Sequence, residues 1–154
     1  MSEERRLGAL LDALTARLAA VSDSPRLDAE ILLAQAIDVP RSYLYAHPED
    51  LPDPAAVGRL ERLAARREAR EPMAYITGMR EFWSLELMVT PDTLVPRPET
   101  EVLVDLALGE IPRRAEWQLL DLGTGSGAIA LAVARERPGC HVTAVDVSAA
   151  ALAV

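Results

Sequence analysis

The sequence contains no lysine and no asparagine, and it has one cysteine and few aromatic residues. All 16 basic side chains are therefore arginine, and 24 acidic residues give a formal net charge of −8. Because Cys140 has no partner for a disulfide within the chain, we expect a reducing, cytoplasmic setting. The acidic balance disfavours direct contact with nucleic acid, which prefers a basic face. It leaves open a protein partner of opposite charge.

Long apolar runs are also missing. No stretch approaches the roughly 20 residues of a membrane span, and the opening residues "MSEERRLGAL" lack the apolar run of a secretion signal. Neither His47 nor His141 has neighbours spaced as metal ligands, so no metal site is predicted. Half of the 154 residues are nevertheless hydrophobic, which is enough for a packed core.

Residues 1 to about 71 are predicted to be helical. One apolar stripe recurs at steps of three and four, namely Leu7, Leu10, Leu11, Leu14 and Leu18. A second helix is expected to begin with Ser24 as N-cap and Pro25 in the first turn. Its expected buried side is Leu27, Ile31, Ala34 and Ile37.

A third helix repeats this arrangement, with Asp53 as N-cap followed by Pro54. Its expected inward residues are Val57, Leu60 and Leu63. The same segment carries five arginines, at positions 59, 62, 66, 67 and 70. We expect them to form a solvated face, since a charge run on a helix is usually exposed.

The segment after residue 75 changes character. Two β-rich runs, "MREFW" and "LELMVT", meet at Trp83-Ser84 and predict a hairpin despite the weak turn signal. Phe82 and Trp83 are expected to pack the hairpin onto a helix, with contact to a substrate as the alternative. The three prolines of "PDTLVPRPETE" predict an extended connector. A helix is expected to resume at Glu99, with apolar positions Val102, Leu103, Leu106 and Leu108.

The last part of the chain predicts a βαβ unit. "WQLLDLG" has the composition of a buried strand, "HVTAVDVS" predicts a second strand, and "GAIALAVARERPG" between them predicts a helix that ends at Pro138-Gly139. Ser148 is expected to cap one further helix. Such a unit calls for a parallel sheet with helices on its faces.

Three glycines, Gly123, Gly125 and Gly127, follow the first of these strands at every second position. A phosphate-binding P-loop needs a lysine after its last glycine, and the absence of lysine excludes it. A dinucleotide fingerprint is formally present as Gly123, Gly125 and Ala128. The third possibility is S-adenosylmethionine (SAM), bound by a Rossmann-like methyltransferase.

Asp121, two positions before Gly123, favours SAM. Its carboxylate would repel a pyrophosphate but attract the ammonium and sulfonium of SAM. The extra glycine, Gly127, lets the backbone approach a bulky ligand closely. Asp146, at the end of the second strand, could accept hydrogen bonds from ribose hydroxyls. A dinucleotide and SAM both carry this ribose, so Asp146 is compatible with either ligand.

Larger sequence blocks make the assignment more specific. "GMREFWSLELMVTPDTLVPRPETEVLVDLAL" followed by "LLDLGTGSGAIALAVARERPGCHVTAVDVS" resembles the HemK/PrmC family of protein-(glutamine-N5) methyltransferases, and the helical start with "SPRLDAEILLAQAI" and "REPMAYITG" is similar too. The resemblance implies methyl transfer from SAM to the side-chain amide of the glutamine in the Gly-Gly-Gln motif of class-1 peptide chain release factors. It also implies that the helical start docks this protein substrate.

The resemblance assigns the cofactor contacts residue by residue. Gly123, Thr124, Gly125, Ser126 and Gly127 would wrap SAM, beside Asp121, and Asp146 would hold its ribose. Leu94 falls where the family places an apolar contact. Arg97, Glu99 and Thr100 would close the methionine end of the pocket or, equally, fix the hinge between domains. No catalytic residue is assigned, because the Asn-Pro-Pro-Tyr loop with which the family aligns the amide nitrogen has no counterpart in a sequence without asparagine.

The expected fold class is α/β in three parts. A helical substrate-docking bundle is expected at residues 1–75, a β-hairpin and proline-rich connector at 76–98, and the incomplete start of a Rossmann-like methyltransferase domain at 99–154. The chain would thus be the N-terminal part of a longer enzyme and inactive by itself. Two alternatives remain: an N6-adenine-type methyltransferase of nucleic acid, and a release-factor-binding module without chemistry.

Overall fold

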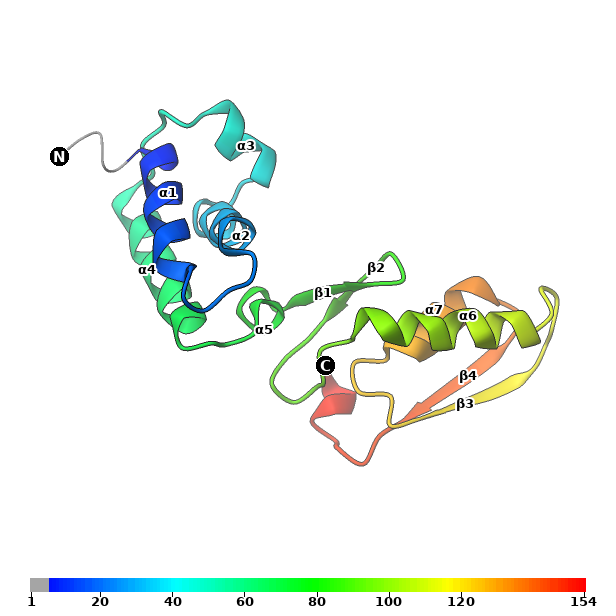
Figure 1. Ribbon diagram of the computed structural model, residues 1–154. Helices are drawn as coiled ribbons and strands as arrows, with labels where there is room; N and C mark the ends of the chain where they lie inside the picture. The colour runs from blue at the N-terminus through cyan, green and yellow to red at the C-terminus, as the bar shows by residue number, and fades with distance from the viewer. Residues whose placement is uncertain (1–5) are drawn as a thin grey trace. The chain divides into compact units, whose positions relative to one another are not determined.

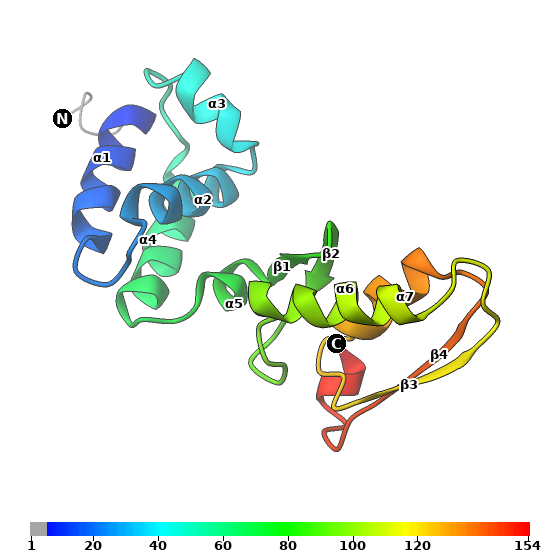
Figure 2. The same ribbon diagram turned by 45° about the vertical axis from the view of Figure 1, so that its right-hand side comes forward.

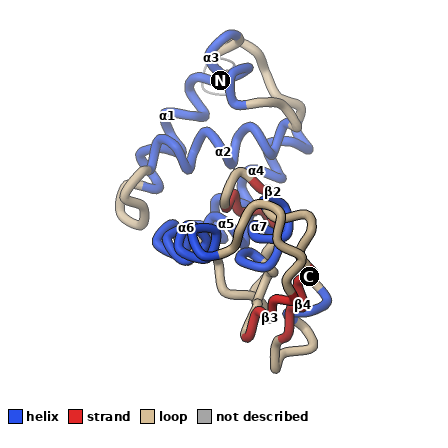
Figure 3. The backbone as a smooth tube through the Cα atoms, turned by 90° about the vertical axis from the view of Figure 1, so that its right-hand side faces the viewer, coloured by secondary structure: helices blue, strands red, loops and turns tan. Residues whose placement is uncertain are grey.

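The computed structural model describes residues 6–154, and the chain divides into two compact units, the first ending at Thr77 and the second beginning at Gly78. Within the described residues the first unit consists of helices and loops (Figure 1, Figure 3). Its helices are α1 (Leu7–Leu18), α2 (Pro25–Ile37), α3 (Arg41–Ala46), α4 (Pro54–Glu68) and α5 (Met73–Thr77). Residues 1–5, which the prediction of a helical start includes, lie outside the described residues.

The apolar stripe of α1 is confirmed. Leu7, Leu11, Leu14 and Leu18 are buried in the core of the unit, and Leu10 is half-buried beside them. They pack α1 against α2 and α4. This spacing places one apolar face inward, as an amphipathic helix requires.

The predicted buried side of α2 is wrong in part. Leu27 is 41% exposed, whereas Ala34 is buried as expected and Ile31 and Ile37 are half-buried. Because α2 packs against α1, α3, α4 and α5, its buried surface is not a single stripe. Inward positions are taken by Ala29, Leu32, Leu33 and Ala36 together with two carboxylates, Asp28 and Glu30.

These two buried carboxylates join α2 to its neighbours. Glu30 accepts hydrogen bonds from Arg26 Nε (3.2 Å), from Arg41 Nη2 (2.8 Å) and from the Tyr45 hydroxyl. Asp28 Oδ2 accepts one from Arg67 Nε at 2.7 Å, which ties α2 to α4. Buried charges are stable only when paired in this way. Arg67 therefore departs from the solvated face predicted for the arginines of α4, whereas residues 59, 62, 66 and 70 are exposed.

The helix starts follow the sequence signals closely. Asp53 Oδ1 accepts the Ala56 N–H at 2.8 Å and so caps α4, with Pro54 in the first turn. Ser24 occupies the N-cap position of α2, although its side chain makes no capping hydrogen bond. In α4, Leu60 is buried as expected, and Val57 and Leu63 are half-buried.

The second unit begins with the predicted hairpin. Strand β1 (Met79–Phe82) pairs antiparallel with β2 (Leu85–Met88), and Phe82 lies opposite Leu85. The turn residues Trp83 and Ser84 both have positive φ, +52° and +55°. That is the conformation of a type I′ hairpin turn, which normally uses Asn or Gly. The turn signal is weak in the sequence because neither residue belongs to those types.

The connector leads into a 3₁₀ turn η2 (Pro98–Thr100), and α6 (Glu101–Glu110) follows it. The helix thus begins two residues later than the expected Glu99. Pro98 keeps Arg97 extended (ψ 142°), which delays the helical conformation. Of the apolar positions in α6, Val104 is fully buried, while Val102, Leu103 and Leu106 are exposed.

The predicted βαβ unit is confirmed as β3 (Gln118–Leu122), α7 (Ala128–Glu136) and β4 (His141–Val145). β3 and β4 pair in parallel, with Leu119 opposite Val142 and Leu122 opposite Val145. Helices α6 and α7 lie over one face of this two-stranded sheet (Figure 1, Figure 2). The other face is uncovered, since Leu120 and Leu122 are 60% and 74% exposed, so the burial predicted for this strand is wrong on that face. This architecture is an incomplete Rossmann-like sheet, as expected.

After β4 the chain ends in a short 3₁₀ turn η3 (Ala151–Ala153). Ser148 Oγ accepts the Ala151 N–H at 3.1 Å, as a capping side chain does, although Ala150 directly precedes the turn and a 3₁₀ turn stands in place of the expected helix. Across residues 6–154, every helix is too short or too polar to cross a membrane.

Candidate functional site

The turn between β3 and α7 requires its glycines. Gly123, Gly125 and Gly127 have φ values of +78°, +56° and +77°. A side chain in this region of φ clashes with the backbone, so that only glycine adopts it at little cost. The alternation of glycines in the sequence therefore reflects a backbone that enters the left-handed region at every second residue.

The N–H groups of this turn are largely used within the protein. Gly123 and Thr124 donate to Val145 O, at 2.8 and 3.0 Å, and Gly127 donates to Thr124 O at 2.9 Å. Gly125 donates to Asp146 Oδ2, also at 2.9 Å. Four of the five N–H groups from Gly123 to Gly127 thus point at internal acceptors. A phosphate-binding turn, in contrast, offers such groups to its ligand.

Asp146 connects the end of β4 to this turn. Its Oδ1 accepts the Ser148 N–H at 2.9 Å, while Oδ2 accepts the Gly125 N–H. The hydrogen bonds from Ser148 and then from Gly125 hold the pKa of the Asp146 carboxyl below its ordinary value. The side chain is half-buried and ionised at neutral pH. Each carboxylate oxygen has a further lone pair with which to accept a ligand hydroxyl.

Asp121 lies at the end of β3 and is half-buried. The Thr124 hydroxyl donates to Asp121 Oδ2 at 2.7 Å, which orients the carboxylate. The two aspartates thus lie at the carboxyl ends of neighbouring parallel strands. In open α/β sheets that edge is where ligands bind.

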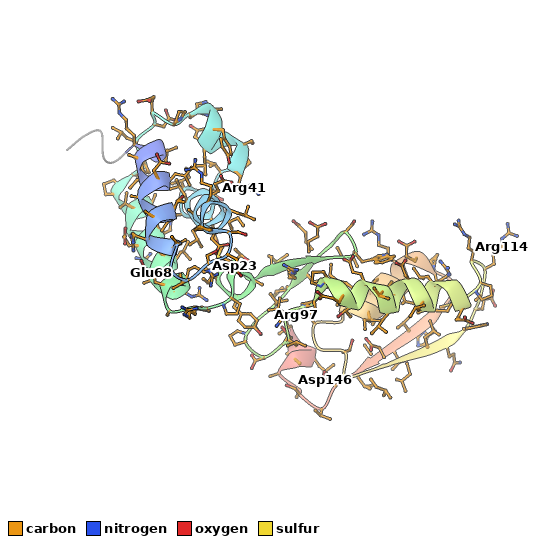
Figure 4. The ribbon with its side chains drawn as sticks, viewed as in Figure 1. Asp23, Arg41, Glu68, Arg97, Arg114 and Asp146 are labelled. Atoms are coloured by element: carbon orange, nitrogen blue, oxygen red, sulfur yellow. The ribbon has the colours of Figure 1, made fainter. Side chains whose placement is uncertain are left out.

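The connector and the glycine turn enclose a common cavity of about 130 Å³. Eight of the eleven residues proposed from the sequence line it: Leu94, Arg97, Thr100, Asp121, Gly123, Thr124, Gly125 and Ser126. Figure 4 shows Arg97 on the connector and Asp146 after β4 at the same end of this unit.

The other three proposed residues do not line this cavity. Gly127 is the N-cap of α7, and Asp146 reaches the cavity wall through Gly125. Glu99 is exposed and is not among the lining residues. The structure adds Pro96 and Ile129, which the sequence reasoning missed, and Ala128, which it named only in the dinucleotide fingerprint. Pro96 could have been found, since it stands inside the same proline-rich signature as Arg97.

The charges of the cavity suit a zwitterion better than an anion. One carboxylate, Asp121, and one guanidinium, Arg97, line the same space, so a ligand with an ammonium and a carboxylate would meet both opposite charges. A phosphate would instead face Asp121 and a turn whose N–H groups are mostly used. The residues present therefore fit SAM better than a dinucleotide. Within residues 6–154, no group of three or more His, Cys, Asp and Glu side chains could hold a metal ion.

Comparison with known proteins identifies both parts of the chain. Residues 9–78 match the family described as PrmC N-terminal domain, and residues 100–154 match the methyltransferase small domain. The first match lies mainly on the helical unit, and the second covers the glycine turn and both strands of the parallel sheet.

Individual relatives give the same result. The chain is 55% identical over 125 residues to a release factor glutamine methyltransferase from Vibrio cholerae, an alignment that covers 81% of this chain and 43% of the relative. It is 50% identical over 125 residues to a protein of the same name from Escherichia coli, covering 81% of this chain and 45% of that protein. To the one from Coxiella burnetii it is 48% identical over 141 residues, covering 92% of this chain and 51% of the relative. The chain spans about half the length of these relatives, and it belongs to the HemK/PrmC methyltransferase family, whose N-terminal portion it matches.

Proposed function

We propose that the cavity binds SAM and that the protein of which this chain forms the N-terminal portion methylates a glutamine side chain in class-1 peptide chain release factors. The observation that carries the proposal is the cavity itself. Two left-handed glycines of the turn, Gly123 and Gly125, line one space with a carboxylate and a guanidinium, in a chain about 50% identical to release factor glutamine methyltransferases.

Each polar residue would have a separate role toward SAM. Asp146 would accept the ribose hydroxyls, since its carboxylate is ionised and already fixed by two N–H groups. Asp121 would attract the ammonium of the methionine part, and Arg97 its carboxylate. Leu94, which is 74% exposed, would cover an apolar part of the ligand. Bound SAM supplies a methyl group on a positively charged sulfur, and the chain's own contribution is to hold and orient it.

The substrate assignment follows the relatives' names and the family resemblance. The acceptor would be the amide nitrogen of the glutamine in a Gly-Gly-Gln motif, and residues 1–75 would help to dock the release factor. An amide nitrogen is a weak nucleophile because its lone pair is delocalised. Its alignment would rest on the family's Asn-Pro-Pro-Tyr loop, and asparagine is absent from these 154 residues.

The test uses a protein that joins this chain to a complete methyltransferase domain. It is incubated with radiolabelled SAM and either a class-1 release factor, the same factor with its Gly-Gly-Gln glutamine changed to alanine, or double-stranded DNA. We expect label only in the unmodified factor, with mass spectrometry placing a single methyl group on that glutamine. Label in DNA, or equal label in both factors, would refute the proposed substrate.

A further inference from the structure

The hairpin turn adopts a conformation that its own residues do not favour. Trp83 and Ser84 both have positive φ, in a turn type that selects asparagine and glycine. Such a conformation persists only where the surrounding structure holds it, and these places are often functional. The contacts that hold this turn therefore indicate what it does.

Two helices supply those contacts. Glu101 Oε1 accepts the Trp83 N–H at 2.9 Å. Arg135 Nη1 donates to Ser84 O at 2.9 Å, and the Trp83 indole N–H donates to Glu136 Oε1 at 3.3 Å. Glu101 is the first residue of α6, whereas Arg135 and Glu136 form the end of α7. The turn thus bridges the start of α6 and the end of α7.

Both helices also begin at walls of the cavity. Thr100, which lines the cavity, directly precedes Glu101, and its N–H donates to the carbonyl of Arg97, another lining residue, at 3.0 Å. On the opposite wall, α7 begins with the lining residues Ala128 and Ile129. A contact that fixes Glu101 against the hairpin therefore also fixes the connector wall relative to the glycine turn.

We infer that Glu101 is a positioning residue for the cofactor cavity: by accepting the Trp83 N–H it holds the Arg97–Thr100 wall against the glycine turn. The inference rests on the proposed function, because the cavity is taken as the SAM site. Glu101 itself does not line the cavity, so its effect on the ligand would be transmitted through Thr100 and Arg97. A carboxylate suits this task, since hydrogen bonds to a charged acceptor are stronger than neutral ones.

Three variants of the chain test the inference: Glu101→Ala, Glu101→Gln, and the control Asp105→Ala, which removes an exposed charge one turn further along α6. The first readout is the exchange rate of the Thr100 amide hydrogen, followed by NMR. We expect Glu101→Ala to raise it about tenfold, with the thermal midpoint of the chain nearly unchanged, because only a local contact is lost. Glu101→Gln retains a neutral acceptor oxygen and should lie between wild type and Glu101→Ala, whereas Asp105→Ala should stay close to wild type.

The second readout is the dissociation constant of SAM, measured by calorimetry on the same variants within the protein that carries the complete methyltransferase domain. We expect about tenfold weaker binding for Glu101→Ala, with partial rescue by Glu101→Gln. Unchanged Thr100 exchange in Glu101→Ala, or the same change in Asp105→Ala, would overturn the inference. If the wild type binds no SAM, the proposed cofactor is refuted, and the exchange rates still decide whether Glu101 holds the connector wall.

Discussion

At the scale of single residues, Asp146 combines a ligand contact predicted from the sequence with a structural role that the hydrogen bonds show. The sequence predicts a ribose ligand, and the structure shows that the same carboxylate fixes Gly125 and Ser148. An aspartate that already accepts two N–H groups has few rotamers left, so it is prepared to accept a further hydroxyl without additional ordering.

The first prediction follows from this double role. Asp146→Asn replaces one carboxylate oxygen by an NH₂ group. This donor would face the N–H of Gly125 or Ser148, and one acceptor is lost. In the protein with a complete methyltransferase domain we expect SAM affinity to fall by about 1–3 kcal/mol, measured by calorimetry. Asp105→Asn, a change of the same kind on an exposed part of α6, should leave the affinity unchanged. Equal affinities for wild type and Asp146→Asn would show that Asp146 does not contact the ligand.

The second prediction concerns the charge state of Asp146. Hydrogen bonds from Ser148 and Gly125 lower its pKa in the folded protein, so the ionised carboxylate stabilises the turn fully above its unfolded pKa. That stabilisation is lost as the pH falls through the lowered, folded pKa. We expect the Gly125 amide resonance to titrate with a midpoint below the ordinary value of 3.8. A midpoint at or above this value, or one that persists in Asp146→Asn, would contradict the assignment.

The third prediction compares the effect on stability of an alanine substitution at two other glycines, Gly139 and Gly109. A Cβ at Gly139 would lie 2.8 Å from the carbonyl oxygen of Ala115, whereas one at Gly109 in α6 meets nothing within 4 Å. Gly139→Ala should destabilise the second unit by about 1–3 kcal/mol through this clash. Gly109→Ala should stabilise it by about 0.5–1 kcal/mol, because alanine loses less entropy in a helix.

Urea unfolding followed by tryptophan fluorescence measures both changes. Trp83 and Trp117 are the two tryptophans of the sequence, so the signal reports the second unit alone. A Gly139→Ala variant at least as stable as wild type would show that the approach of Gly139 to Ala115 is not tight, and a destabilised Gly109→Ala would contradict the entropy argument for α6.

At the scale of elements, the sequence is most informative where one signal dominates. The leucine spacing of α1, the cap of Asp53 and the βαβ pattern each specify their element locally, and all three are confirmed. The orientation of α2 fails because it depends on four neighbouring helices, which no local pattern reveals. The hairpin turn at Trp83-Ser84 is weakly signalled for the same reason, since side chains of α6 and α7 hold it.

The residues of the candidate site likewise fall into those that a local sequence signal reveals and those that depend on packing. The glycine spacing and the two aspartates can be recognised in the sequence, because the backbone conformation and the charge demand those residue types. That the connector lines the same cavity is known beforehand only through the family resemblance. Contributions such as Ile129 depend on how α7 packs, which a single sequence does not encode locally.

The fourth prediction tests the ion pair that joins α2 to α4. Arg67→Met leaves the carboxylate of Asp28, which is 7% exposed, without its guanidinium partner. We expect a loss of about 3 kcal/mol in the free energy of unfolding, measured by circular dichroism at 222 nm in urea. Arg17→Met breaks two ion pairs, with Glu61 and Glu68, that remain solvent-exposed, and should cost less than about 1 kcal/mol. Similar losses for the two variants would show that the burial of Asp28 does not increase the contribution of its ion pair to the free energy of unfolding.

At the scale of the whole molecule, the two units differ in how completely they bury their apolar surface. The first encloses a continuous core drawn from its helices α1 to α5. The second has its core on one side of the sheet, between β3–β4, the hairpin and helices α6 and α7, while Leu120 and Leu122 on the other side are mostly exposed. Sheets in α/β proteins are normally covered on both faces.

The last prediction is that the two units differ in stability when each is made as an independent chain. Because the core of the first unit is complete, residues 1–77 made as an independent chain should unfold cooperatively in urea when followed at 222 nm. Residues 78–154, whose sheet is bare on one face, should be less stable and should bind the dye ANS through that exposed apolar surface. Replacing Leu120 and Leu122 by threonine keeps β-propensity and should reduce the dye binding. If residues 1–77 unfold without cooperativity, or if the double variant binds as much dye as the parent, the two units do not differ in the completeness of their cores.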